Sequence, residues 1–271
     1  MVRPLSASDL DSAHAAAQRV VETHRALVEF LKVGQTLAEI DAFVGRTLEK
    51  LNCTSCFLGY KQGRSPAFPS YACLSLNECV VHGTAGYLTK PMEAGDVLSI
   101  DIGVKHHGWI GDAAWTYAFQ TQNETAKRLM ACGQESLRRG IEQLQPGRPF
   151  LEFAKAVQQH VEVECGFHCV RGLGGHGYGR KLHTPPYVAN NVPSYPGEWP
   201  DAFTPCKPGM LLAIEPKVAV GTGEIRQRSR EWPVFTADNS LSVHYEHDVY
   251  ISESGPKVLT EGLDDLPAIV G

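Results

Sequence analysis

The stretch Gly95-Asp-Val-Leu-Ser-Ile-Asp101 decides the fold, because a later stretch repeats its pattern. The later stretch reads Gly209-Met-Leu-Leu-Ala-Ile-Glu215, and its terminal acid comes 114 positions after that of the first. A turn glycine, a short apolar run and a terminal carboxylate are typical of a buried strand that presents an acid at its end. The repeat therefore predicts two half-domains that face one another across a shared acidic site.

Histidines and further acids accompany both stretches. His82 precedes the first stretch and His176 precedes the second, while Asp112 and Glu246 follow them. Four carboxylates cannot share a protein interior unless cations compensate their charge. A metal ion is the simplest such cation, and a site this acidic has the charge to hold two.

The composition is that of an ordinary globular protein. Of 271 residues, 43% are apolar and 20% are charged, which leaves ample material for a core. A net charge of −5 and the lack of a basic cluster argue against nucleic-acid and anionic-membrane partners. No apolar run approaches the roughly 18 residues of a membrane span, and charges interrupt the region where a signal peptide needs an apolar core. We therefore expect a cytoplasmic protein.

The cysteines do not form a zinc or disulfide framework in the sequence. The chain has 8 of them, scattered through a length that needs no covalent stapling. Cys53-Thr-Ser-Cys56 is a lone CxxC without a second pair, so neither a zinc ribbon nor a redox pair is favoured. We expect reduced thiols, partly in the core.

Helical and strand-like segments alternate in two blocks. Apolar residues recur at helical spacing over 8–32, 36–51, 124–144 and 150–165, and Thr36-Leu-Ala-Glu39 has the form of a capping box. Strand-like segments cover 72–76, 97–104, 211–220 and 249–251, and the glycine-rich residues 172–179 are expected to form a loop. This order predicts an α+β fold of two pseudo-symmetric halves, with a curved antiparallel sheet backed by helices, and one domain over residues 1–271.

The acidic residues are spaced for metal chemistry. Asp101 and Asp112 are 11 positions apart with glycines between them, so a hairpin would place both carboxylates on one face. Oxygen and imidazole ligands without thiolate suit manganese, iron, cobalt or zinc. Two bridged ions can activate water and stabilise a tetrahedral intermediate, which is the chemistry of amide and ester hydrolysis. His82 and His183 are candidates for proton transfer or for bonding the oxyanion.

At these residues the chain resembles the type I methionine aminopeptidases of the pita-bread metallopeptidase superfamily. The resemblance covers about residues 8–255, with five motifs in the family's order. The matched motifs are Asn77-Glu-Cys-Val-Val-His82-Gly, Ile100-Asp101 with Gly111-Asp112, Gly175-His176-Gly-Tyr-Gly-Arg-Lys-Leu-His183, Ile214-Glu215-Pro and Ser242-Val-His-Tyr-Glu246-His247.

The resemblance implies a pita-bread fold, a dinuclear metal site and removal of the initiator methionine when the second residue is small. Asp112 and Glu246 would bridge the two ions, and Glu215 would also move the proton of the nucleophilic water. His82 and His183 would contact the scissile peptide and its tetrahedral intermediate. The five implied metal ligands are Asp101, Asp112, His176, Glu215 and Glu246.

The resemblance also implies a methionine pocket, formed by Tyr60, Phe68, Cys73 and Trp232. From spacing alone, each of these is equally well an ordinary core residue. The chain departs from the family at residues 61–67 and 191–207, which are longer than usual, and at Leu182, where an aromatic residue is common. The substrate would be a peptide or nascent-chain N-terminus, with the ribosome as a candidate partner, and the protein is expected to be a monomer.

Three alternatives share this fold. Prolidases and Xaa-Pro aminopeptidases use a similar ligand set, but they carry a large N-terminal domain that is expected to be missing here. Type II methionine aminopeptidases insert a helical subdomain, for which the spacing between His176, Glu215 and Glu246 leaves no room. Non-catalytic pita-bread binding modules have lost ligands, whereas this sequence keeps all five.

Overall fold

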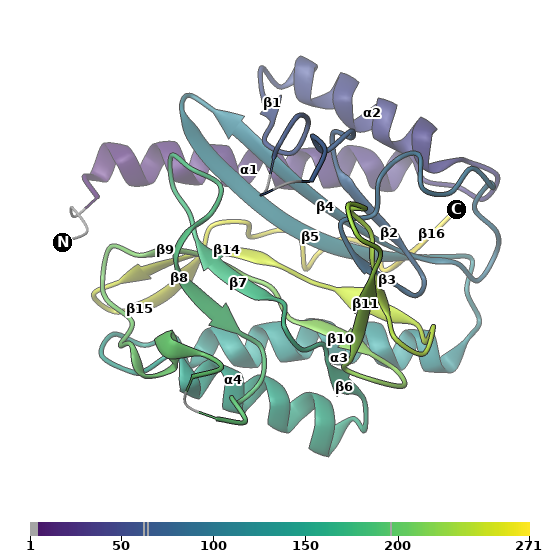
Figure 1. The fold of residues 1–271 in the computed structure, drawn as a ribbon. Coiled ribbons are helices and arrows are strands. Elements are labelled where there is room, and N and C mark those ends of the chain that lie inside the picture. The colour runs from purple at the N-terminus through teal and green to yellow at the C-terminus, as the bar shows by residue number, and fades with distance from the viewer. Residues whose placement is uncertain (1–4, 62, 64, 196) are drawn as a thin grey trace.

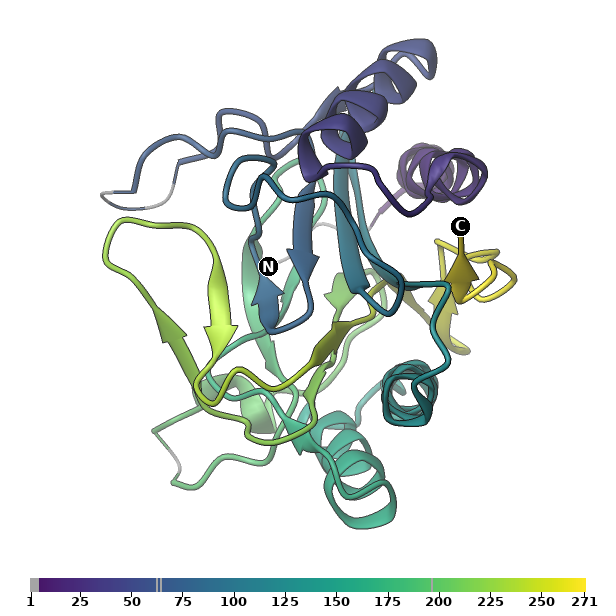
Figure 2. The same ribbon diagram turned by 90° about the vertical axis from the view of Figure 1, so that its right-hand side faces the viewer.

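The strands of the molecule form a central layer with a pair of helices at each end. The computed structural model describes residues 5–61, 63, 65–195 and 197–271. Helices α1 (Ala7–Phe30) and α2 (Leu37–Lys50) lie in the upper half of the view, with α1 passing behind the strands, and α3 (Glu124–Glu142) and α4 (Leu151–Gln158) lie in the lower half (Figure 1). The view from the side shows the same separation of the two pairs (Figure 2). The predicted arrangement of two helix-backed halves is confirmed.

Capping boxes begin both helices of the first half. In α2 the Thr36 hydroxyl accepts from the Glu39 amide while the Glu39 carboxylate accepts from the Thr36 amide, as the sequence predicts. Ser6 and Asp9 form the same reciprocal pair at the start of α1. Each box satisfies backbone donors that have no partner inside the helix, so both helices have defined starting points.

A long hairpin forms the centre of the first half. Strands β4 (Val97–His106) and β5 (Trp109–Phe119) pair antiparallel, joined by His107 and Gly108, which both have positive φ. Two such residues are the signature of a tight hairpin turn whose twist matches the strands. Helix α1 lies close behind β5 because residue 111 is glycine, where a Cβ would come within 2.5 Å of the Ala16 carbonyl oxygen.

The strands, including those of the hairpin, divide into four hydrogen-bonded sheets. The pairing orders are β1-β4-β5-β16 with β2 on β4, then β13-β10-β6, β11-β12-β3 and β15-β14-β9-β7-β8, and among the described pairs only β16 with β5 is parallel. The strands not yet introduced are β1 (Thr54–Ser55), β2 (Cys73–Leu76), β3 (Cys79–Val81), β6 (His168–Cys169), β7 (Gly174–Gly177), β8 (Thr184–Ala189), β9 (Leu211–Ile214), β10 (Lys217–Ala219), β11 (Ile225–Gln227), β12 (Val234–Thr236), β13 (Ser242–His244), β14 (His247–Ser252), β15 (Gly255–Val258) and β16 (Ile269–Val270).

Three local predictions were wrong in detail. The strand predicted over 211–220 breaks between β9 and β10, since Pro216 has no amide hydrogen to continue the ladder. The loop predicted around His176 is partly strand β7, where a Cβ on Gly175 would come within 2.2 Å of the Ala213 carbonyl oxygen. That glycine therefore permits close strand packing and does not indicate a loop. The helix predicted over 150–165 changes from α4 to the π-helix η1 (Gln159–Glu164).

The two halves share one hydrophobic core. A single cluster of buried apolar side chains extends from Leu27 on α1 through Trp115 on β5 to Leu137 on α3. In the described part of the chain, no helix combines the length and apolar character needed to cross a membrane. A short 3-10 helix, η2 (Pro200–Phe203), lies within the proline-rich residues 191–207, of which residue 196 is outside the described residues.

Candidate metal and substrate site

One pocket of about 340 Å³ contains every predicted site residue. Its walls come from both halves of the molecule, and acidic side chains line one part while aromatic side chains line another. The predicted residues in its lining are Tyr60, Phe68, Cys73, His82, Asp101, Asp112, His176, His183, Glu215, Trp232 and Glu246.

The acidic part of the pocket is assembled from two strands and two breaks between strands. Asp101 pairs with Ala114 across the hairpin and Asp112 pairs with Gly103, so both carboxylates lie on the same face of β4 and β5, as predicted. Glu215 follows β9, and Glu246 lies between β13 and β14. The tertiary fold thus brings together acids that are far apart in sequence.

Glu246 belongs to two groups of potential metal ligands. One oxygen or nitrogen from each of Asp112, His176 and Glu246 lies within 4.8 Å of the others, and the same holds for Asp101, His244 and Glu246. His176 Nε2 is also 3.8 Å from Glu215 Oε1. A carboxylate shared between neighbouring groups is the arrangement that a bridged pair of ions requires.

Backbone and side-chain hydrogen bonds join the halves at this point. The Glu246 amide donates to the Ala114 carbonyl at 2.9 Å. In the opposite direction, the Asp112 amide donates to the carboxylate of Asp248 at 2.9 Å. Asp248 is fully buried and is absent from the sequence-based set of site residues. It holds the backbone of Asp112, so it positions one of the central acids.

The electrostatics of the acids indicate a site built for cations. Burial raises the pKa of Asp101 to about 8, and the Glu215 charge adds to this effect. Burial and neighbouring carboxylates likewise raise the pKa of Asp112 and of Glu246 well above their ordinary values. The Oδ1 atoms of Asp101 and Asp112 are buried without a hydrogen-bond partner. Divalent ions would supply both the missing charge and the missing partners, so these residues fit the metal that the sequence predicts.

His176 presents one ring nitrogen to the acids. Its Nδ1 donates to the Gly177 carbonyl at 3.1 Å, which leaves the lone pair of Nε2 directed towards the acids. Burial lowers the pKa of this imidazole. A neutral ring held in one tautomer by a backbone carbonyl is the usual state of a metal-binding histidine.

Sequence reasoning missed two cationic or polar partners of Glu215. The Lys217 ammonium forms a buried ion pair with Glu215 Oε2, and His244 Nε2 lies 3.2 Å from the same oxygen. Burial alone would raise the pKa of Glu215, but Lys217 and His244 hold it below its ordinary value. Each partner is two positions from a predicted ligand, Lys217 from Glu215 and His244 from Glu246. That spacing was the signal that could have found them.

The two remaining predicted histidines lie at the edge of the acidic group. His82 has a positive φ of 58° and its ring centroid is 6.1 Å from that of Trp232. His183 is exposed, with Nδ1 2.9 Å from the Tyr60 hydroxyl and its ring 4.3 Å from that of His176. Burial lowers the pKa of His82 to about 4. At neutral pH its ring is therefore uncharged and can donate or accept a proton.

An apolar recess adjoins the acids. Phe68 and Trp232 contact edge-to-face at 5.3 Å, and the Trp232 indole N–H donates to the Pro66 carbonyl at 3.0 Å. Of the longer segment 61–67, Pro66 thereby holds the Trp232 side chain. Residues 62 and 64 of that segment lie outside the described residues. Leu182 lines the pocket at the position where the family commonly has an aromatic side chain, and Phe57, which the sequence did not single out, also lines it.

Comparison with known proteins identifies the family. The model of metallopeptidase family M24 matches residues 11–253. Methionine aminopeptidase 1 of Bacillus subtilis is 35% identical over 245 residues, which are 90% of this chain and 93% of that protein. The crystal structure of methionine aminopeptidase from Thermotoga maritima superposes with a TM-score of 0.85 at 31% identity, covering 96% of this chain and 99% of that one.

A prolidase shares the fold at greater distance. The prolidase from Pyrococcus furiosus superposes with a TM-score of 0.72 at 20% identity, and the match covers 95% of this chain but only 65% of the prolidase. This likeness shows a common fold and no more, whereas the methionine aminopeptidases match at higher identity over nearly their whole length. The chain therefore belongs to metallopeptidase family M24 and, within it, to the methionine aminopeptidases.

Proposed function

We propose that this enzyme removes the N-terminal methionine from polypeptides whose second residue is small, using two divalent metal ions. The observation that carries the proposal is the pocket in which carboxylates from both halves adjoin an apolar aromatic recess. An unbranched thioether side chain suits an aromatic-lined recess of this kind. The acids beside the recess are where the scissile peptide of such a substrate would lie.

The proposed metal ligands are the five residues on which the family resemblance rests. Asp101, Asp112, His176, Glu215 and Glu246 would hold the ions, with Asp112 and Glu246 shared between them. When bound, the ions supply Lewis acidity and lower the pKa of a water molecule. Oxygen and imidazole ligands accept cobalt, manganese, iron or zinc, so the donor set leaves the identity of the metal to be measured.

The remaining roles fall to groups of the chain itself. The neutral ring of His82 would contact the scissile peptide, and His183 would bond the oxygen on which negative charge develops. Tyr60 holds His183 through its hydroxyl and so orients it. Glu215 would carry the proton from water to the leaving amine. Its contacts with Lys217 and His244 lower its pKa and so keep it ionised and ready to accept that proton.

Release of methionine from a Met-Ala-Ser peptide tests the proposal. With manganese, iron or cobalt supplied, we expect turnover of this peptide and none of the corresponding Xaa-Pro peptide. Replacing alanine by a bulky second residue should lower kcat/KM. Faster turnover of Xaa-Pro peptides would favour the prolidase alternative, and absence of turnover with every metal would indicate a non-catalytic binding module.

We also infer the setting in which the enzyme works. A nascent chain is the natural source of a methionine N-terminus, so the substrate would be met in the cytoplasm, near the ribosome. The negative net charge argues against direct contact with ribosomal RNA. We expect a monomer, which sedimentation of the purified protein would test.

A further inference from the structure

A second cluster of potential metal ligands lies behind the second half of the molecule. Cys132 is on α3, His160 is in η1 and Cys165 follows η1 directly. One ligand atom from each lies within 4.8 Å of the others. Cys132 and His160 are buried, whereas Cys165 is partly exposed. None of the three lines the active-site pocket, so the mechanism does not account for their convergence.

The π-helical turn places His160 and Cys165 on one face. The Cys165 amide donates to the His160 carbonyl at 3.0 Å, a bond that spans five residues. In an α-helix of 3.6 residues per turn, residues five apart would face different directions. π-helical turns are rare and occur frequently at functional sites. The irregularity in η1 thus has a specific consequence, which is to direct an imidazole and a thiol towards Cys132.

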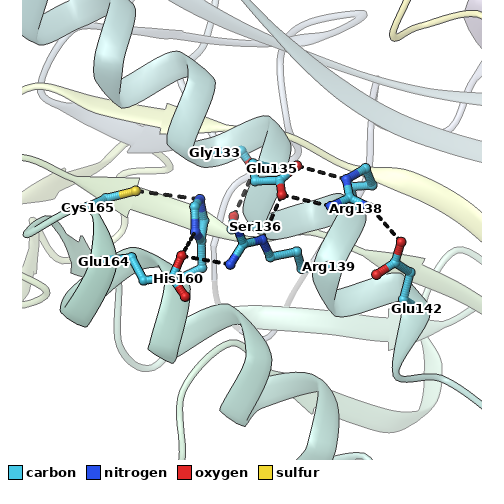
Figure 3. Close-up of polar contacts among 9 residues, drawn as sticks. All are labelled: Gly133, Glu135, Ser136, Arg138, Arg139, Glu142, His160, Glu164 and Cys165. Carbon is cyan, nitrogen blue, oxygen red and sulfur yellow. Dashed lines mark hydrogen bonds and ion pairs between the residues drawn. The ribbon is translucent and has the colours of Figure 1, made fainter.

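Acidic and basic side chains hold the imidazole in one tautomer. His160 Nδ1 lies 3.0 Å from Glu164 Oε2, and Arg139 donates to the same oxygen at 2.7 Å (Figure 3). Arg139 is held in turn by Glu135 at 2.6 Å. The Glu164 carboxylate, paired with Arg139, is a hydrogen-bond acceptor and therefore takes the hydrogen bond from the Nδ1–H group of His160. The Nε2 lone pair is then free and faces the thiols, as in carboxylate–histidine–metal arrangements.

The spacing of the donor atoms suits a tetrahedral ion. With zinc–sulfur and zinc–nitrogen bonds of about 2.3 and 2.05 Å, tetrahedral angles separate sulfur from nitrogen by about 3.6 Å. Cys165 Sγ lies 3.5 Å from His160 Nε2. A thiol-to-imidazole hydrogen bond has a similar length, so this distance alone does not separate the two cases. The third donor and the fixed tautomer are what favour the ion.

We propose that Cys132, His160 and Cys165 bind a thiophilic cation of the zinc class, separate from the active-site metals. The ion would join η1 to α3, and its fourth position would be open to solvent beside Cys165. On binding, each thiol loses its proton to solvent as the thiolate bonds the ion, so no oxidation or reduction takes place. The proposal does not depend on the peptidase activity.

Cobalt(II) is the probe, because a thiolate ligand gives it an intense near-ultraviolet charge-transfer band that oxygen and nitrogen ligands do not. In the reduced full-length protein we expect this band to appear during a cobalt titration, to saturate at the intensity of a single cobalt–thiolate site, and to disappear when zinc is added. Cys132→Ser and Cys165→Ser should abolish it. Glu164→Gln keeps all three ligands and changes only an exposed side chain, and it should weaken cobalt binding roughly 10-fold or more.

Cys73→Ser is the matched control, since Cys73 is the buried thiol beside Asp101 in the active-site pocket. This variant should keep the band. Absence of the band in folded wild-type protein would overturn the proposal, as would a band that survives Cys165→Ser or is lost in Cys73→Ser. A Cys132–Cys165 disulfide found by peptide mapping of metal-free protein from its own host would also overturn it. Circular dichroism confirms that each variant is folded.

Discussion

The two halves of the molecule deliver their carboxylates by different means. In the first half, Asp101 and Asp112 lie on neighbouring strands of one unbroken hairpin. In the second half, Glu215 and Glu246 lie in breaks between strands. A continuous ladder fixes its side chains through regular backbone bonds, whereas Glu215 in its break contacts the side chains of Lys217 and His244. This difference shows that a repeated sequence pattern can place corresponding carboxylates in one site although the local backbone structure around them differs.

The partners of the acids differ in the same way. Lys217 and His244 lie opposite one another on β10 and β13, and both contact Glu215. On the hairpin, Asp112 is positioned through its backbone amide by Asp248. One half therefore places its acid by backbone geometry and the other by charge, and the following substitutions separate these two contributions.

Removing the central acid of the hairpin should have the largest effect. We expect Asp112→Ala to lower manganese or cobalt affinity by at least about 100-fold and peptide turnover by at least roughly 10³-fold, because a ligand shared by two ions is lost. Calorimetric metal titration and a methionine-release assay measure both. The exposed Asp11→Ala serves as the control and should change neither. Unchanged metal affinity in Asp112→Ala would refute the assignment of this ligand.

His82→Ala tests the proposal that this residue of the first half contacts substrate without holding metal. We expect metal affinity within about twofold of wild type and kcat lower by roughly 10²–10³-fold, as for loss of a group that acts in the transition state. The exposed His168→Ala is the matched control. If His82→Ala loses its metal ions, the proposal that His176 binds metal and His82 does not is wrong.

A buried histidine behind the hairpin should make stability depend on pH. His24 on α1 is fully buried with Nδ1 2.9 Å from the Tyr117 hydroxyl, and burial lowers its pKa from 6.5 to about 4. Between pH 6.5 and about pH 4, His24 is protonated in the unfolded chain but neutral in the folded chain. The free energy of unfolding therefore falls as the pH drops through this window. The loss is at most about 3 kcal/mol and is complete below pH 4.

Denaturant unfolding at several pH values measures this effect. His24→Gln should unfold with a shallower dependence on pH between 4 and 6.5, whatever its stability at pH 7. The exposed His168→Gln serves as the comparison and should retain the wild-type slope. Equal slopes for wild type and His24→Gln would show that His24 is not the group responsible.

The smallest expected effect comes from replacing Lys217, the buried lysine of the second half. Lys217→Met removes the ammonium that pairs with Glu215, so we expect this carboxylate to bind metal about tenfold more tightly. Lys217→Arg retains the charge and should resemble wild type in the same titration. A weaker metal affinity in Lys217→Met would mean that the lysine holds Glu215 in place and does not compete for it.

Much of the fold could be predicted because its signals are local. The Thr36 capping box, helical periodicity and the glycines near the hairpin act over a few residues, and the elements predicted from them formed as expected, apart from the π-helical end of the segment 150–165. Strand breaks were not predicted, since an apolar run reads the same whether or not Pro216 interrupts its ladder. The glycines around His176 were also misjudged, because glycine permits both loops and close strand packing.

The sequence by itself determined the two-half fold and the chemical class of the site, since a repeated apolar strand with a terminal acid constrains both. Only the tertiary structure decided that Lys217 and His244 contact Glu215, and that Asp248 holds Asp112. It alone brought Cys132 to His160 and Cys165 across two helices. Apart from Lys217 and Glu215, which are two positions apart, these contacts join residues that are far apart in sequence. They therefore depend on how whole elements pack and not on any local pattern.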